Sequence, residues 1–410
     1  MNSNPALCKI ISDRIAASPQ KRITFAEYMD LALYHPECGY YSTQAVNLGK
    51  QGDFFTSVHL GADFGELLAE QFVQMWEILG QPTPFSLVEM GAGQGHLASD
   101  ILKYLKQQYP DFFAALEYII VEKSPTLKQE QQQRLQEFSV RWCNLEEIPN
   151  NSITGCFFSN ELVDALPVHQ FTLENQQLRE IYVTTRQEGE RGRDKEVDSS
   201  LSPVSPLPPL PVSSFIEVTG EPSTPQMVEY FDLVGIDFAK NGFADGYRSE
   251  INLAALGWLG AVANSLQRGY VLTIDYGYPA SRYYNPRRSQ GTIQCYYQHQ
   301  RHDNPYINIG QQDITAHVDF TALERSGESY GLDKVGFTQQ GLFLMALGLG
   351  SRIAALSHHD QPIMQLIQRR DALHQLLDPL GLGNFGVLVQ SKGLTDKEIS
   401  QKLKGLIVPE

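Results

Sequence analysis

The sequence predicts a doubly wound α/β fold, and two observations carry this prediction. Between residues 85 and 159, short apolar segments rich in strand formers alternate with longer segments at helical spacing. This alternation is typical of a largely parallel sheet covered by helices on both faces. The first strand runs directly into Glu89-Met-Gly-Ala-Gly-Gln-Gly95, and a glycine turn at a strand end lets a ligand approach bare backbone. We therefore expect an α/β core with a ligand site at its strand ends.

The length, charge and cysteine content of the chain limit the kinds of protein that it can be. With 410 residues, 42% of them hydrophobic, the chain suits roughly two to three domains, or one fold with large insertions. The net charge of −15 disfavours nucleic acid and anionic membranes as main partners, because both repel an acidic surface. The five cysteines are scattered without a C-x-x-C pair, so we expect neither a metal site nor a disulfide framework.

No segment predicts targeting or membrane insertion. The stretch from Met1 to Cys8 has neither a basic-then-apolar signal nor an Arg-rich transit helix. The longest apolar run, 342–356, is interrupted by glycines and Arg352, and it falls short of the ~20 residues that a membrane helix needs. We expect a protein of a reducing compartment, located in the cytoplasm and not inserted in a membrane.

Residues 1–80 are expected to form an N-terminal helical lid. The capping box Thr24-Phe-Ala-Glu27 opens a helix that reaches Leu33, and a longer amphipathic helix is predicted over 58–79. Between them lies the loop Gly52-Asp-Phe-Phe-Thr-Ser57. This loop either covers a bound ligand with its backbone N–H groups and Asp53, or serves only as a turn and helix cap.

The core is expected in two parts, 81–166 and 269–410. Its first part is predicted as strands 85–90, 117–121, 138–142 and 155–159 with helices 95–108 and 125–137. The second part begins with a fifth strand, 269–277, and ends with strands 334–339 and 385–390 and a helix over 363–377. Asp319 is expected to cap a helix that ends near Tyr330, with Gly331 as its C-cap.

The segment 167–268 departs from the alternating pattern and predicts an inserted subdomain. Residues 168–173 and 178–183 alternate at period two across a polar turn, which indicates a hairpin. Segment 186–214 contains a run of prolines between Leu201 and Pro211, so we expect a flexible insertion with polyproline II segments. A strand over 215–218 and a helix over 251–267 complete this subdomain, which serves a substrate or partner.

The glycine turn separates two classes of cofactor. The dinucleotide pattern G-x-G-x-x-G would need glycine at position 96, where this chain has His96. The acid-led spacing from Glu89 to Gly95 is instead typical of proteins that bind S-adenosylmethionine (SAM). Glu122 follows the next strand, where an acid can accept both hydroxyls of a ribose. The expected cofactor-binding residues are Glu89, Gly91, Ala92, Gly93, Gly95, Glu122, Lys123, Asp53, Phe54, Thr56 and Asn160.

Asn160 and Glu161 directly follow the fourth predicted strand, and Asp164 lies three residues further on. Because the carboxyl ends of neighbouring parallel strands converge on one crevice, these side chains should share it with Glu89 and Glu122. The alternative is that Asn160 and Glu161 only occupy the first turn of a helix. We predict Glu161, Asn160 and Asp164 as the catalytic residues.

Several segments together resemble the MidA-type methyltransferases, whose mitochondrial members are protein-arginine methyltransferases needed to assemble respiratory complex I. The order and spacing of the segments carry the resemblance, which extends from about residue 23 to 345. The matching stretches begin at Ile23, His35, Gly52, Val88, Asn160, Ile274 and Asp313, and the last of them reads Asp-Ile-Thr-Ala-His-Val-Asp-Phe.

The resemblance implies a Rossmann-like class I SAM methyltransferase sheet with an N-terminal helical lid and a β-containing insertion between the fourth and fifth core strands. It also implies SAM as cofactor and a protein arginine as substrate, in the first instance on a complex I-type subunit. A catalytically silent assembly protein and a small-molecule methyltransferase remain open alternatives, and so does a homodimer paired through 1–80. Carboxylates should grip the guanidinium, with Glu161 leading. The expected substrate-side residues are Glu250, Asp275 and Tyr276.

Overall fold

The structure is a computed structural model that describes residues 3–43, 56–186, 215–298, 300–356 and 362–407. Two sequence predictions therefore lie outside the described residues. They concern Asp53 and Phe54 of the N-terminal loop, and all but the first residue of the proline-rich segment 186–214.

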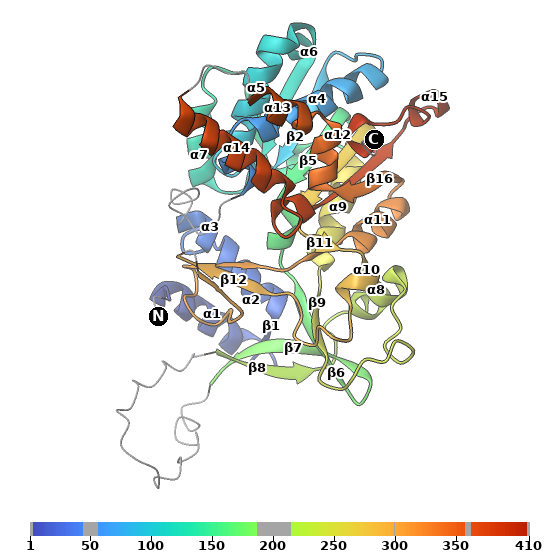
Figure 1. Ribbon diagram of the computed structural model, residues 1–410. Helices are drawn as coiled ribbons and strands as arrows, with labels where there is room; N and C mark the ends of the chain where they lie inside the picture. The colour runs from blue at the N-terminus through green and yellow to red at the C-terminus, as the bar shows by residue number, and fades with distance from the viewer. Residues whose placement is uncertain (1–2, 44–55, 187–214, 299, 357–361, 408–410) are drawn as a thin grey trace.

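The core is a seven-stranded sheet with the order β4-β3-β2-β5-β10-β17-β16. Figure 1 labels its strands β2, β5 and β16. Five neighbours, from β4 to β10, run parallel, while β17 runs antiparallel to β10 and to β16. This arrangement confirms the predicted α/β class. The strands are β2 Phe85–Met90, β3 Leu116–Val121, β4 Val140–Cys143, β5 Ile153–Asn160, β10 Leu266–Asp275, β16 Asp333–Gln339 and β17 Gly386–Lys392.

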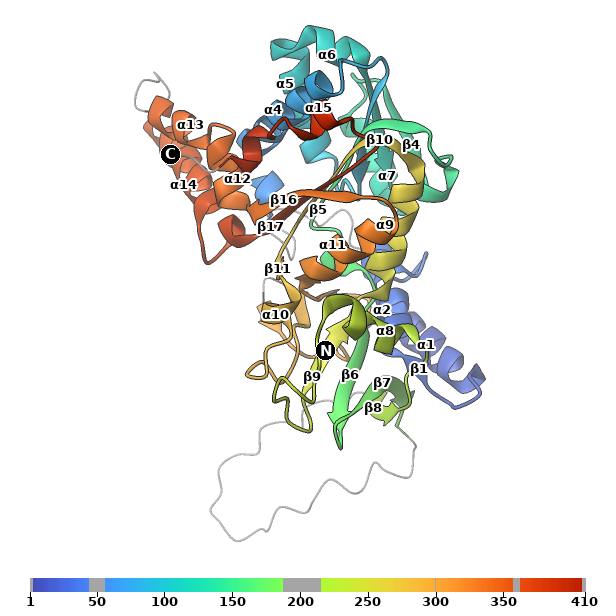
Figure 2. The same ribbon diagram turned by 90° about the vertical axis from the view of Figure 1, so that its right-hand side faces the viewer.

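Helices cover both faces of this sheet because successive side chains along a strand point to opposite faces. In β2, Phe85 and Leu87 join a cluster with α4 (Asp63–Ile78) and α5 (His96–Gln108). Val88 and Met90 join the opposite cluster with α9 (Leu253–Ser265) and α11 (Phe320–Ser329). Figure 2 shows α9 and α11 on one side of the sheet, and α12 and α14 on the other.

A second lobe is built around a sheet in which β7 pairs with β6, β8 and β1, and β6 pairs with β9. The N-terminal helices α1 and α2 pack on it, where Tyr28 contacts Phe215 and Tyr306. Buried Cys295, Ile309 and Ile314 belong to the same cluster. The strands are β1 Ile23–Thr24, β6 His169–Glu174, β7 Gln177–Thr185, β8 Phe215–Gly220 and β9 Arg248–Ile251, and the helices are α1 Pro5–Ala17 and α2 Phe25–Tyr34.

The N-terminal block 1–80, expected to form a lid of its own, is divided between the two lobes. Helices α1 and α2 belong to the second lobe, whereas α4 packs on the core sheet. The long helix predicted over 58–79 begins only at Asp63, after a short 3-10 turn over Ser57–His59. The helix predicted over 251–267 begins at Leu253, because Asn252 caps it by accepting a hydrogen bond from the N–H of Ala255 at 2.8 Å.

The remaining elements connect the two lobes or lie at their edges. Two small sheets pair β11 with β15, and β12 with β13 and β14. These elements are α3 Tyr40–Thr43, α6 Pro110–Ala115, α7 Pro125–Arg134, α8 Gln226–Val234, β11 Gly277–Tyr278, α10 Ala280–Tyr283, β12 Gln294–Tyr297, β13 Gln300–His302, β14 Asp313–Thr315, β15 Val318–Asp319, α12 Gln340–Ala346, α13 Leu349–Ala355, α14 Ile363–Leu377 and α15 Asp396–Ile399.

Within the described ranges, no helix is both long and apolar enough to cross a bilayer. All five cysteines are free thiols. The described residues also contain no group of three or more His, Cys, Asp or Glu side chains arranged to hold a metal ion.

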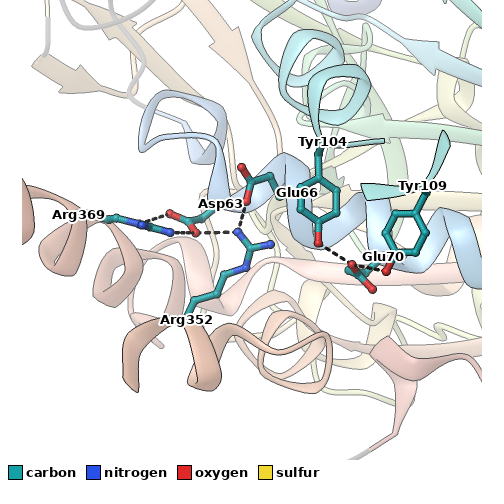
Figure 3. Close-up of polar contacts among 7 residues, drawn as sticks. All are labelled: Asp63, Glu66, Glu70, Tyr104, Tyr109, Arg352 and Arg369. Carbon is teal, nitrogen blue, oxygen red and sulfur yellow. Dashed lines mark hydrogen bonds and ion pairs between the residues drawn. The ribbon is translucent and has the colours of Figure 1, made fainter. Parts of the chain in front are cut away.

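Charged residues attach the C-terminal helices α13 and α14 to α4 (Figure 3). Asp63, at the start of α4, accepts two hydrogen bonds from Arg369 at 2.8 and 2.9 Å and one from Arg352 at 2.8 Å. Arg352 also pairs with Glu66 one turn further along α4. Burial alone would raise the pKa of Asp63, but the hydrogen bonds from Arg369 and Arg352 outweigh it, so the pKa is lowered. The carboxylate therefore stabilises the folded state in its charged form.

Replacing Asp63 with asparagine should lower the free energy of unfolding by about 1–3 kcal/mol, because two partly buried guanidinium groups lose their shared acceptor. Urea unfolding followed by circular dichroism measures this change. The control is Asp371→Asn, which removes the carboxylate of an exposed pair with Arg370 and should be close to neutral. Equal effects of the two substitutions would show that the cluster adds no particular stability.

Candidate active site

A cavity of about 470 Å³ lies at the carboxyl ends of the core strands, and both lobes contribute to its wall. The core contributes the ends of β2, β3 and β5, and the second lobe contributes residues around α3 and β14. Of the residues predicted from the sequence, the cavity brings together Thr56, Glu89, Gly91, Ala92, Gly93, Glu122, Lys123, Asn160, Glu161 and Asp164.

The glycine turn has the conformation that its sequence predicts. Gly91, Gly93 and Gly95 have φ angles of 71°, 51° and 77°, a region that side chains with a Cβ rarely adopt. A Cβ on Gly91 would lie 2.8 Å from Cδ1 of Leu162, whereas a Cβ on Gly93 would meet nothing within 4 Å. Gly93 thus exposes its backbone to the cavity. Gly95 is not in the cavity wall and instead forms the N-cap of α5.

Glu89 is buried at the end of β2, where one of its oxygens accepts a hydrogen bond of 2.7 Å from the hydroxyl of Tyr118. Burial raises the pKa of Glu89 to about 7, against the lowering effect of this hydrogen bond, and the charge of Glu122 adds to the increase. Tyr118 reaches Glu89 because β2 and β3 are parallel neighbours. The predicted acid is therefore held in a defined position in the cavity wall.

Glu122 is tied to the glycine turn through Gln131. The side-chain amide of Gln131 donates to Glu122 at 3.0 Å and to the carbonyl of Gly93 at 2.7 Å. The indole of Trp142 donates to the oxygen of the same amide at 3.0 Å. Glu122 also accepts from the N–H of Ser124 at 2.8 Å. Burial raises the pKa of Glu122, although these hydrogen bonds oppose the increase.

Replacing Gln131 with leucine should weaken SAM binding by about 10- to 100-fold, because Gly93 and Glu122 each lose the donor that orients them. Isothermal titration calorimetry measures the affinity. Gln133→Leu provides the matched control, since Gln133 lies on the same helix and is exposed. A Gln131 variant that binds SAM as tightly as the control would rule out this role.

Several carboxylates gather at another part of the cavity. Glu161 and Asp164 follow β5, and Asp313 comes from β14 of the second lobe. Glu161 has a φ of 54° and accepts a hydrogen bond of 3.1 Å from the side-chain amide of Asn160. The alternative that Asn160 and Glu161 only occupy the first turn of a helix does not hold, because β5 extends through Asn160 and a short 3-10 turn begins at Val163.

The pKa values of these acids are raised. Burial and then the charge of Asp275 raise the pKa of Glu161 to about 8. For Asp164, burial and the charges of Asp275, Asp313 and Glu161 raise the pKa well above its usual range. Oδ1 of Asp164 and Oδ1 of Asn160 are buried without a hydrogen-bond partner in the described part of the chain. The cluster is therefore suited to a cation that would bring both charge and donors.

Two of the predicted substrate-side residues lie behind the cavity wall rather than in it. Asp275, at the end of β10, accepts hydrogen bonds from the N–H groups of Val163 at 2.8 Å and Asp164 at 3.3 Å. It therefore holds the turn that presents Asp164. Tyr276 donates a hydrogen bond to Thr315, and its hydroxyl also contacts Asp164. Both residues position a wall residue.

The third predicted substrate-side residue, Glu250, is not in the cavity wall. It lies in β9, not at the start of a helix, and accepts hydrogen bonds of 2.9 Å from the N–H and the hydroxyl of Thr292. A Cβ on Gly291 would come within 2.1 Å of its Oε1. Glu250 therefore holds a turn of the second lobe, and the strand that contains it was not predicted from the sequence.

Sequence reasoning missed several residues that complete the wall. Tyr41 donates to both oxygens of Asp313 at 3.0 and 3.1 Å and stacks on Tyr34. His59 contacts Thr56 at 2.9 Å, and its ring packs edge-on against His96. The segment His35–Tyr41 carried a signal, since it is among the stretches that support the family resemblance, but its aromatic residues were not assigned to the site.

The comparisons with known proteins agree with this geometry. A family model described as S-adenosyl-L-methionine-dependent methyltransferase matches residues 67–338. The protein arginine methyltransferase NDUFAF7 homolog, mitochondrial, of Drosophila melanogaster is 30% identical over 388 residues, and the match covers 88% of this chain and 79% of that protein. The human protein arginine methyltransferase NDUFAF7, mitochondrial, is 27% identical, with 91% and 81% covered.

A solved structure has the same fold over nearly the whole chain. It is a crystal structure of a superfamily member from Burkholderia thailandensis, described as a methyl transferase and bound to S-adenosyl-homocysteine. It matches with a TM-score of 0.79 and 27% identity, over 98% of this chain and 94% of that chain. A native crystal structure from the same superfamily and organism matches with a TM-score of 0.78 and 28% identity, over the same shares.

One sequence expectation is corrected by these relatives. The relatives from fly, mouse and human are mitochondrial proteins, which contradicts the expectation of a cytoplasmic protein. That expectation depended on the composition of the first residues, which does not determine the compartment.

The family model covers most of the chain, and the fly relative is matched over more than two thirds of its length. The resemblance to the MidA-type proteins is thereby confirmed, and SAM is the cofactor. The chain belongs to the MidA-type family of S-adenosyl-L-methionine-dependent methyltransferases.

Proposed function

We propose that the protein transfers the methyl group of SAM to a guanidinium nitrogen of an arginine in a partner protein. One observation carries the proposal: Glu161, Asp164 and Asp313 lie in the same cavity as the glycine turn. An acidic cluster beside a SAM site favours a cationic acceptor. The relatives named as protein arginine methyltransferases support the choice of arginine.

The cavity residues fit SAM. Gly91 and Gly93 would let the methionine part lie against backbone, and Ala92 and Lys123 line the same wall. Glu122 would hold the ribose hydroxyls, since an ionised carboxylate has about four acceptor positions and Ser124, Gln131 and Lys123 do not fill all of them. The unpartnered Oδ1 of Asn160 is a further acceptor. When bound, SAM supplies an electrophilic methyl group on a sulfonium.

The carboxylates would orient the acceptor and take its proton. A guanidinium has five donors in a fixed fork, which two carboxylates can hold so that one nitrogen is aligned. A cation beside Glu161 lowers the pKa of this carboxyl, so that it ionises when the substrate binds. Glu161, with Asp164 behind it, would then accept the proton that the nitrogen loses as it is methylated.

The test is incubation of the protein with isotopically labelled SAM and a mitochondrial lysate, followed by mass spectrometry. Label on arginine of a protein is the expected result, and a subunit of a complex I-type assembly is the first candidate. Label only on metabolites would favour a small-molecule methyltransferase. Tight SAM binding with no labelled product would favour a catalytically silent assembly protein.

A further inference from the structure

The segment 276–302 has a charge opposite to that of the whole chain. It contains Arg282, Arg287, Arg288 and Arg301 and no Asp or Glu, whereas the net charge of the chain is −15. We call these four residues the arginine strip. Arg282, Arg287 and Arg301 are exposed, and Arg288 is half-buried.

The carboxylates of the described residues leave the arginine strip without an ion pair. In the described part of the chain, none of its members lies within ion-pair distance of a carboxylate. Arg282 and Arg288 instead lie over the ring of Tyr278, at 4.4 and 4.8 Å from its centroid. Other arginines of this protein, such as Arg248 and Arg369, are paired with carboxylates. The strip therefore retains donors for an outside anion.

Aromatic contacts connect the arginine strip with the carboxylates of the cavity. The ring of His317 packs edge-on against the rings of Tyr278 and Tyr276, with distances between ring centroids of 5.2 and 4.9 Å. Tyr276 in turn contacts Asp164 in the cavity wall. In the small sheet, Tyr296 of β12 pairs with Arg301 of β13 on one side and with Asp313 of β14, a cavity residue, on the other. The strip thus borders the acidic part of the cavity.

We propose that the arginine strip binds acidic side chains of the substrate protein that flank the residue entering the cavity. This inference rests on the proposed function, because it takes the acceptor to be a cationic side chain of a protein. The substrate would then be an arginine in an acidic sequence context. The cavity would select the cation, and the strip would select its neighbours.

An acidic peptide fits this surface better than a nucleic acid. A polyanion that ran along the strip would also meet the carboxylates around Asp164 and the overall negative charge, which repel phosphate. Acidic side chains at a few positions can instead pair with the exposed arginines one at a time. Exposed charges at the rim of an interface act mainly on specificity and association rate, and their effect decreases with salt.

The test compares binding of three labelled peptides by fluorescence anisotropy, with the protein saturated with S-adenosylhomocysteine. Each peptide has one central arginine, flanked by glutamate, glutamine or lysine. We expect the glutamate peptide to bind about tenfold tighter than the glutamine peptide at low salt, with the lysine peptide weakest. The double variant Arg282→Glu/Arg301→Glu should lose this preference and favour the lysine peptide. The control Arg370→Glu changes an exposed arginine that pairs with Asp371 on α14 and should keep the wild-type order.

Equal affinities for the glutamate and glutamine peptides would overturn the proposal. Displacement of the glutamate peptide by transfer RNA at lower concentrations than by unlabelled peptide would overturn it in favour of a nucleic acid. Calorimetry with S-adenosylhomocysteine shows that the variants are folded. Methyl transfer to the same peptides is measured separately. A lack of turnover would count against the proposed function, whereas the order of the three peptide affinities tests the role of the arginine strip.

Discussion

Replacing Gly93 with leucine is expected to abolish SAM binding. Gly93 has a φ of 51°, and a Cβ built on it would point into open space. That space is part of the cavity that Glu89 and Glu122 line, so a leucine side chain would occupy the volume that the cofactor needs. Strain of the left-handed backbone adds about 1–2 kcal/mol. Calorimetry should show a loss of more than about 100-fold in affinity.

Gly242→Leu separates the steric effect from the backbone strain. Gly242 also has a positive φ, 73°, and also has no atom within 4 Å of an added Cβ. It is exposed and is not among the cavity residues, so its leucine variant should bind SAM normally. If the Gly93 variant bound SAM as the Gly242 variant does, the assignment of the glycine turn to the cofactor would be wrong.

The central core strands β2, β3 and β5 were predictable because each is a short, largely apolar and buried segment. The predicted strand 85–90 matches β2 at both ends, and 117–121 matches β3 within one residue. The strand over Arg248–Ile251 was not predicted, because two of its four residues are charged and the buried Glu250 accepts hydrogen bonds from Thr292 and Tyr283, which lie far away in the sequence. Helix α1 was also missed, although Asn4 and Pro5 form an N-cap and an N1 proline that signal a helix start.

The part of the site that lies at the strand ends of the core sheet was predictable from the sequence. Glu89, Glu122 and Asn160 lie at the ends of parallel strands or just beyond them, so strand order alone brings them to one cavity. Gln131 and Tyr41 lie on helices, and which face of a helix meets the cavity depends on tertiary packing. Their roles therefore could not be read from local sequence patterns.

Replacing Glu161 with glutamine is expected to preserve SAM binding and to abolish most of the turnover. Glutamine keeps an oxygen for the 3.1 Å hydrogen bond from Asn160, so the wall keeps its shape. It cannot hold a guanidinium by charge or accept its proton. We expect SAM affinity within about threefold of wild type and a loss of turnover on an arginine peptide of about 100-fold or more. Calorimetry and transfer of labelled methyl measure the two effects.

The same substitution should stabilise the protein at higher pH. Burial and the charge of Asp275 raise the pKa of Glu161 from 4.5 to about 8, so between these values the folded state binds more protons than the unfolded state. The contribution of Glu161 to stability therefore falls as pH rises through this window. Since the side chain faces a cavity that admits water, we expect Glu161→Gln to gain only about 1–2 kcal/mol at pH 8, and little at pH 4.5.

The sign of this pH dependence distinguishes a functional carboxylate from a structural one. A glutamate that the fold needs in charged form has a lowered pKa, and its replacement destabilises the protein most at high pH. A glutamate kept in place for a cationic substrate lowers the stability of the substrate-free protein, because it is buried beside the charge of Asp275. Urea unfolding across the pH range, with Glu146→Gln as an exposed control, decides between them. If the Glu161 variant were less stable than wild type at pH 8, the role of Glu161 would be to stabilise the turn after β5, and not to take part in methyl transfer.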